Sequence, residues 1–162
     1  MQSFDVVTTI GVAPDVAFDL ARDMGLHAAS VGRGNERPVA GVIHGLIGPG
    51  EQVTLQATHF GVRFTLTSRV TAFDRPRRFV DEQVRGPFRS WHHTHDFEAT
   101  PAGTVMTDRI RFAAPYGPVG WLVERMVLRR YVRRIITHRA AWLKAEAERC
   151  RRHESRTTRW PD

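Results

Sequence analysis

The sequence predicts an α+β fold in which a curved antiparallel sheet of about six or seven strands wraps around one long C-terminal helix. Two observations support this fold. After Gly120 the chain continues for more than thirty residues without another glycine or proline, which predicts one helix from about Tyr116 to about Cys150. Between residues 51 and 113, apolar and polar side chains alternate in short segments that glycine- or proline-containing turns separate, a pattern typical of antiparallel strands.

The N-terminal part is expected to form one strand followed by two short helices. Residues 4–10, FDVVTTI, are rich in β-branched side chains, which favour strands. Pro14 suits the first turn of the next helix, because a helix does not need the amide hydrogen there. A second short helix is expected at residues 24–29, before the polar and flexible segment GRGNERP. Residues 39–47 then predict a short strand, which the following GPG ends.

Residues 51–70 predict a hairpin with a defined register. The two alternating segments are joined at Phe60-Gly61, which suits a tight turn. The predicted pairs are His59 with Val62, Ala57 with Phe64, Leu55 with Leu66, and Val53 with Ser68. This register brings the apolar side chains of both strands onto one face of the sheet. His59 shares that inward face, but its place beside the turn predicts a position at the rim.

The strand expected at residues 79–84 has two conflicting registers. The turn at residues 74–77 would direct Asp81 inward, whereas the turn at Gly86-Pro87 would direct Glu82 inward. A bulge in this part of the sheet must absorb the difference. Both orientations of the strand therefore stay open.

The last hairpin gathers ionisable side chains on its inward face. The turn TPAG at residues 100–103 places His95 opposite Asp108. The other predicted pairs are Phe97 with Met106, His93 with Ile110, and Trp91 with Phe112. Two histidines and an aspartate are therefore expected among large apolar side chains, on the face directed toward the helix.

Three interpretations of this group stay open. A buried carboxylate is costly unless it is paired, so His95 and Asp108 would form a satisfied structural pair. Alternatively, Asp108 would hold one tautomer of His95, and the two residues, with His93, would orient a ligand or transfer protons. The third interpretation is a metal site, because His93 and His95 lie on one face of a strand, with Asp108 or His59 as a third ligand. Since the neighbouring side chains are mostly apolar, no metal and no cofactor is assigned.

Length and composition predict a single domain at residues 1–150 and a disordered basic tail at residues 151–162. The chain has 162 residues and one cysteine, which excludes an internal disulfide. It begins without the basic and apolar layout of a secretory signal, and no segment approaches the roughly 20 apolar residues that cross a bilayer. These features lead us to expect a cytoplasmic protein.

The net charge of +7 is attributed mainly to solvated arginines on the outer face of the long helix and in the tail. Nucleic-acid binding is not expected, because exposed aromatic side chains and a groove-reading element are not evident. Weak contact with an anionic membrane surface is the alternative use of this charge. Arg139 lies on the apolar side of the predicted helix, where it would either contact a ligand or reach water, and the second is expected. The oligomeric state is not predicted.

Three segments carry a likeness to known proteins. They are GLIGPGEQVTLQATHFGV at residues 45–62, FVDEQVRGPFRSWHHTHDFE at 79–98, and MTDRIRFAAPYGPVGWLVERMVLRRY at 106–131. Together with the order of the elements, they resemble the SRPBCC or START-like superfamily of helix-grip proteins, over about residues 3–148. That superfamily includes pollen-allergen-like proteins, polyketide aromatase/cyclases and coenzyme-Q-binding proteins, and the chain is most similar to its bacterial single-domain ligand-binding members. The resemblance implies a deep apolar cavity between sheet and helix.

The pattern and the resemblance together predict binding or carriage of an apolar or aromatic small molecule, lipid or polyketide-like, in that cavity. The predicted ligand-binding residues are Leu55, His59, Phe64, Leu66, Trp91, His93, His95, Phe97, Met106, Asp108, Ile110, Phe112, Tyr131 and Ile135. The alternative is an enzyme of the polyketide cyclase or dehydratase type, in which His95 and Asp108, with His93, act as acid and base. The sequence does not decide between a carrier and an enzyme.

Overall fold

A computed structural model describes residues 1–30, 36–59, 61–115 and 127–157, with side chains up to residue 152. The described elements follow one another as β1 (Gln2–Ile10), α1 (Pro14–Ala21), α2 (Met24–Ser30), β2 (Arg37–Gly41), β3 (Gln52–His59), β4 (Val62–Asp74), β5 (Arg78–Arg85), β6 (Ser90–Thr100), β7 (Gly103–Ala113) and α4 (Arg129–Thr157). The predicted order of a strand, two short helices, a series of strands and a long helix is confirmed.

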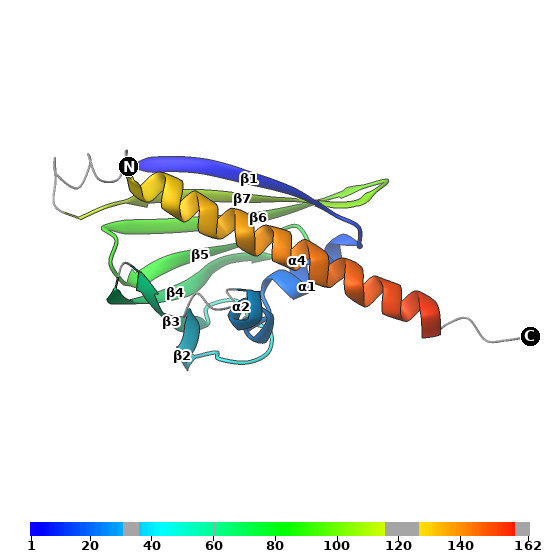
Figure 1. The fold of residues 1–162 in the computed structure, drawn as a ribbon, viewed down its shortest axis with the longest axis horizontal. Coiled ribbons are helices and arrows are strands. Elements are labelled where there is room, and N and C mark those ends of the chain that lie inside the picture. The colour runs from blue at the N-terminus through cyan, green and yellow to red at the C-terminus, as the bar shows by residue number, and fades with distance from the viewer. Residues whose placement is uncertain (31–35, 60, 116–126, 158–162) are drawn as a thin grey trace, which may run out of the picture.

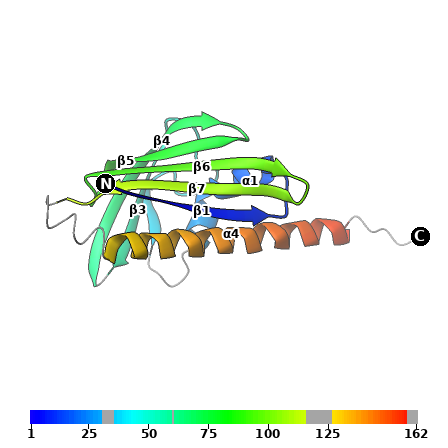
Figure 2. The same cartoon turned by 90° about the horizontal axis from the view of Figure 1, so that it is seen from above.

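The seven strands form one antiparallel sheet in the order β1-β7-β6-β5-β4-β3-β2, and α4 runs across one face of it (Figure 1). The view from above shows α4 beside β1, with β7, β6 and β5 following beyond β1 (Figure 2). Among the described elements, α4 packs mainly against β1, and α1 and α2 also contact it. The sheet and its covering helix form the predicted α+β helix-grip fold.

Both hairpin registers predicted from the turns are confirmed. In the first hairpin, β3 pairs with β4 so that Leu55 lies opposite Leu66 and His59 lies opposite Val62. In the last hairpin, β6 pairs with β7 so that His95 lies opposite Asp108. Turn geometry determines these registers because the two strands of each hairpin are adjacent in sequence.

The conflict over β5 is resolved by irregular pairing with β4. The register of these two strands shifts between Thr67 and Ser68 and again between Val70 and Ala72. On its other side, β5 pairs with β6 so that Asp81 lies opposite His93. Directly paired residues share a face of the sheet, so Asp81 joins the inward side chains of β6.

The long helix buries one face and exposes the other, as its periodicity predicts. Its buried positions follow a spacing of three or four residues, and they are Val132, Ile136, Ala140, Leu143 and Ala147. The opposite face carries the exposed Arg130, Arg133 and Arg134. None of the helices in the described ranges has the length and apolar character required to cross a membrane.

Some predicted element boundaries differ from the structure. The short strand expected at residues 39–47 is β2 at Arg37–Gly41. Beyond Gly41 the chain is outside the named strands until β3 begins at Gln52, and Leu46 forms an isolated bridge with Asp23. The predicted beginning of the long helix at Tyr116 lies outside the described residues, as do residues 31–35 and the end of the tail at 158–162. Helix α4 continues to Thr157, seven residues beyond the expected domain boundary at residue 150.

Candidate functional site

A cavity of about 820 Å³ lies between the inner face of the sheet and helices α2 and α4. It forms where the sheet curves away from α4, which packs mainly against β1 at the other side of the sheet. Its wall is mostly apolar and comes mainly from α2, β3, β4, β5, β6 and α4. Nine of the predicted ligand-binding residues line it, and they are Leu55, His59, Phe64, Leu66, Trp91, His93, His95, Tyr131 and Ile135.

The other five predicted residues are buried but are not among the described residues of the cavity wall. They are Phe97, Met106, Asp108, Ile110 and Phe112. Side chains of other elements pack against this part of the inward face. Phe18 of α1 packs on Phe97 with ring centroids 5.3 Å apart, and Phe4 of β1 packs on Phe112 at 6.5 Å. These side chains therefore belong to the core behind the cavity.

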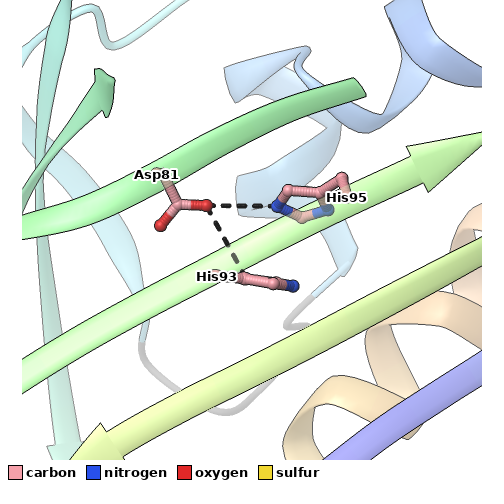
Figure 3. A group of neighbouring side chains, drawn as sticks. All are labelled: Asp81, His93 and His95. Carbon is pink, nitrogen blue, oxygen red and sulfur yellow. Dashed lines mark hydrogen bonds and ion pairs between the residues drawn. The ribbon is translucent and has the colours of Figure 1, made fainter. Parts of the chain in front are cut away.

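Four ionisable side chains form a cluster at one wall of the cavity. Asp81 comes from β5, His93 and His95 from β6, and Asp108 from β7. The side chains of both histidines and of Asp108 are no more than 5% exposed, whereas that of Asp81 is 22% exposed. Asp81, His93 and His95 line the cavity, and Asp108 lies behind them (Figure 3 shows the first three).

The two carboxylates hold the two imidazoles from opposite sides. Oδ1 of Asp108 lies 2.9 Å from Nε2 of His93 and 2.8 Å from Nδ1 of His95. Oδ1 of Asp81 lies 3.1 Å from Nε2 of His95 and 3.6 Å from Nδ1 of His93. The pairing of His95 with Asp108 predicted from the register is therefore present, but Asp108 is shared with His93. Asp81, which the sequence could not orient, completes the cluster.

The cluster shifts the pKa values of the two histidines in opposite directions. Burial and the nearby charge of His95 lower the pKa of His93, which favours its neutral form. Burial opposes protonation of His95 as well, but hydrogen bonds to Asp108 and Asp81 outweigh it and raise the His95 pKa. For Asp81, burial is outweighed by the hydrogen bond from His95 and by the charges of both histidines, which lower its pKa to about 2. The cluster therefore favours the protonated form of His95, whose two ring nitrogens face Asp81 and Asp108 beside the cavity.

A second polar group, His27 and Glu36, lies at the α2 side of the cavity. Nε2 of His27 lies 3.0 Å from Oε1 of Glu36. Nδ1 of His27 is buried and has no hydrogen-bond partner among the described residues. Burial and the charge of Arg139 both lower the pKa of His27. Arg139 is partly exposed, lines the cavity and donates a hydrogen bond to the carbonyl oxygen of Ala21 at 3.2 Å.

His59 lies apart from the cluster, at the end of β3. Its Nδ1 lies 2.6 Å from the hydroxyl oxygen of Tyr131 on α4, and its ring lies 6.1 Å from that of Phe64. This contact joins the sheet to the helix across the cavity wall. Among the described residues, Asp81, His93 and His95 are close enough together to hold a metal ion. The third residue of this group is Asp81, and not the Asp108 or His59 expected from the sequence.

Solved structures share this architecture at low sequence identity. TTHA0849 from Thermus thermophilus matches with a TM-score of 0.75 and 14% identity, over 92% of this chain and 99% of that chain. The ZhuI aromatase/cyclase from Streptomyces sp. R1128 matches with a TM-score of 0.71 and 18% identity, over 91% and 94% of the two chains. Major latex-like protein 151 from Panax ginseng matches with a TM-score of 0.62 and 14% identity, over 90% and 97%. These matches establish the fold.

Sequence comparison identifies the family. No curated protein matches the chain by sequence. Residues 1–148 match the family described as polyketide cyclase / dehydrase and lipid transport. The match covers the sheet, both short helices and the part of α4 up to residue 148, and so includes the described segments that line the cavity. The chain therefore belongs to the polyketide cyclase / dehydrase and lipid transport family, within the SRPBCC superfamily that its sequence resembles.

Proposed function

We propose that this protein binds an apolar or aromatic small molecule, lipid or polyketide-like, in the cavity between the sheet and α4. The observation that carries the proposal is a mostly apolar cavity of about 820 Å³. Binding sites for small molecules are typically concave, roughly 300–1,000 Å³ in volume and mostly apolar, with a few polar groups that orient the ligand. Membership of a family that includes lipid transport proteins and polyketide cyclases supports the same ligand class.

In this proposal the apolar body of the ligand contacts Leu55, Phe64, Leu66, Trp91 and Ile135. A carbonyl or hydroxyl group of the ligand would meet the polar wall formed by Asp81, His93 and His95. Burial of such a group is favourable only when it is hydrogen-bonded, so this wall would fix which end of the ligand enters first.

Substitution of Ile135 by tryptophan tests the cavity directly. The added indole would occupy part of the volume that the ligand needs, so we expect the affinity for 1-anilinonaphthalene-8-sulfonate to fall at least about tenfold. Fluorescence titration of the purified protein measures this change. The matched control is Val7→Trp, because Val7 is 64% exposed on β1 and adds the same indole away from the cavity. Equal affinity in the Ile135→Trp variant and the unmodified chain would contradict binding in this cavity.

Catalysis of the cyclase or dehydratase type is the second candidate function. The observation that favours it is the position of His95, whose two ring nitrogens lie 3.1 Å from Asp81 and 2.8 Å from Asp108 and which lines the cavity. A group of this kind can donate a proton to a bound carbonyl compound or remove one from it.

For the catalytic alternative, we expect His95→Ala to lower the turnover of a poly-β-carbonyl substrate by roughly 10²–10⁴-fold, the usual contribution of a general acid or base. Binding of 1-anilinonaphthalene-8-sulfonate should change only modestly, because the apolar wall is retained. Product formation followed by mass spectrometry, beside His92→Ala as a control on the same strand, measures the effect. If the unmodified chain binds such compounds and converts none of them, the carrier function is retained and the catalytic one is lost.

A further inference from the structure

One carboxylate oxygen of Asp81 faces both His93 and His95 at the cavity wall (Figure 3). One donor atom from each residue lies within 4.8 Å of the other two. Oδ1 of Asp81 lies 3.1 Å from Nε2 of His95 and 3.6 Å from Nδ1 of His93. In a tetrahedral site with bonds of about 2.0–2.1 Å, neighbouring ligand atoms are about 3.3 Å apart. The two distances fall on either side of that value.

Asp108 determines which nitrogen of each ring faces Asp81. Its Oδ1 accepts a hydrogen bond from Nε2 of His93 and from Nδ1 of His95, at 2.9 and 2.8 Å. A neutral imidazole carries one N–H, and the other nitrogen then carries a lone pair. Metal-binding histidines commonly donate their remote N–H to a carboxylate in this way, which fixes the tautomer and the orientation of the ring.

The nitrogens on the other side need a cation. With its N–H donated to Asp108, His93 presents the lone pair of Nδ1 to Asp81, at a distance too long for a hydrogen bond. Nε2 of His95 faces the same carboxylate oxygen. The negative charge of the Asp81 carboxylate can be balanced in two ways. His95 can carry a second proton, or one metal ion can bond to this oxygen and to the two facing nitrogens. The positive charge of Arg139 also reaches Asp81, but the guanidinium is hydrogen-bonded to the carbonyl oxygen of Ala21.

We propose that Asp81, His93 and His95 bind a divalent transition-metal ion such as Zn²⁺, with Asp108 as the carboxylate that positions both imidazoles. Two imidazole nitrogens and one carboxylate oxygen suit Zn²⁺ and similar ions, whereas Mg²⁺ and Ca²⁺ prefer oxygen ligands. Three protein ligands leave a coordination position open, and because all three residues line the cavity, this position faces it. The proposal goes beyond the binding of an apolar molecule, because it assigns a metal ion to the polar wall of the cavity.

Calorimetric titration of the chelator-treated, tag-free chain with Zn²⁺ tests the site. We expect one equivalent to bind. The Asp108→Asn variant should bind Zn²⁺ roughly 10–100-fold more weakly, which is the usual effect of losing an outer carboxylate. Asp81→Asn and His95→Gln each remove a ligand and should weaken binding by more than Asp108→Asn does. Asp81→Asn is the decisive variant, because its side chain is partly exposed and the substitution disturbs packing least.

His92→Gln is the matched control, since His92 neighbours the cluster in sequence but pairs with Glu82 and does not line the cavity. Its Zn²⁺ affinity should equal that of the unmodified chain. The proposal is overturned if the unmodified chain takes up no stoichiometric Zn²⁺, or if folded Asp81→Asn protein binds Zn²⁺ as tightly as the unmodified chain does. Binding of 1-anilinonaphthalene-8-sulfonate to the metal-free chain is measured separately, so that failure of the metal site and failure of the cavity proposal are distinguishable.

Discussion

Replacement of Asp108 by alanine is expected to lower the free energy of unfolding by roughly 3–5 kcal/mol, the usual cost of removing one partner of a buried ion pair. Asp108 is 4% exposed, and its Oδ1 accepts hydrogen bonds from His93 and His95. Burial raises its pKa, but these hydrogen bonds outweigh burial and hold the Asp108 pKa below its usual range. Alanine would leave two buried imidazoles with Asp81 as their nearest acidic partner, together with a small void.

Urea unfolding at neutral pH, followed by circular dichroism, measures this loss. Asp108→Asn is the companion variant, because it keeps the shape and removes the charge, so any remaining destabilisation reports the lost charge. The control is Asp5→Ala on β1, where an exposed carboxylate is removed and stability should hardly change. An Asp108→Ala protein as stable as the Asp5→Ala protein would show that the cluster does not stabilise the fold.

The Phe18→Ala variant is expected to lose roughly 3–5 kcal/mol of stability, the usual range for a buried phenylalanine. Phe18 of α1 is fully buried, at 0% exposure. Its ring packs edge-on against Phe73, Phe79 and Phe97, with centroids 5.2 to 5.3 Å apart. Such aromatic pairs add about 0.5–1.5 kcal/mol each beyond the area that they bury. Few other single side chains in the described core join so many aromatic rings.

The same substitution should reach the polar cluster, because Phe79 stacks on the imidazole of His95 with centroids 4.1 Å apart. Thermal and urea unfolding measure the stability. Val16→Ala on the same helix is the control, since Val16 is 42% exposed and should change stability little. A Phe18→Ala protein that unfolds at the same urea concentration as Val16→Ala would contradict a central packing role for this ring. We also expect Phe18→Ala to weaken the proposed Zn²⁺ site, which the same calorimetric titration measures.

The hairpins show how far local sequence reasoning extends. The turns Phe60-Gly61 and TPAG determine which residues of the flanking strands lie opposite each other, and both registers are confirmed. Strand pairing between sequence neighbours depends on the turn and on alternation, and both can be read directly from the chain. The facing positions of His95 and Asp108 follow from that local geometry.

Asp81 shows where such reasoning ends. Its orientation depends on two shifts of register between β4 and β5, which accompany the curvature of the whole sheet. Neither neighbouring turn contains that information, and the turns conflict. The sequence therefore predicted two histidines and one aspartate, while the fold supplies the second aspartate that faces the cavity.

From its amino acids alone, this protein is recognisable as a curved antiparallel sheet with a long covering helix, and the inward face of its last hairpin can be read residue by residue. Only the tertiary structure decided how that face is divided between the cavity and the core. Phe97 and Phe112 share the inward face with Trp91, but Phe18 of α1 packs on Phe97 and Phe4 of the neighbouring strand β1 packs on Phe112. The physical reason is that alternation determines which side of a strand a residue occupies, whereas packing between distant elements determines what lies against that side.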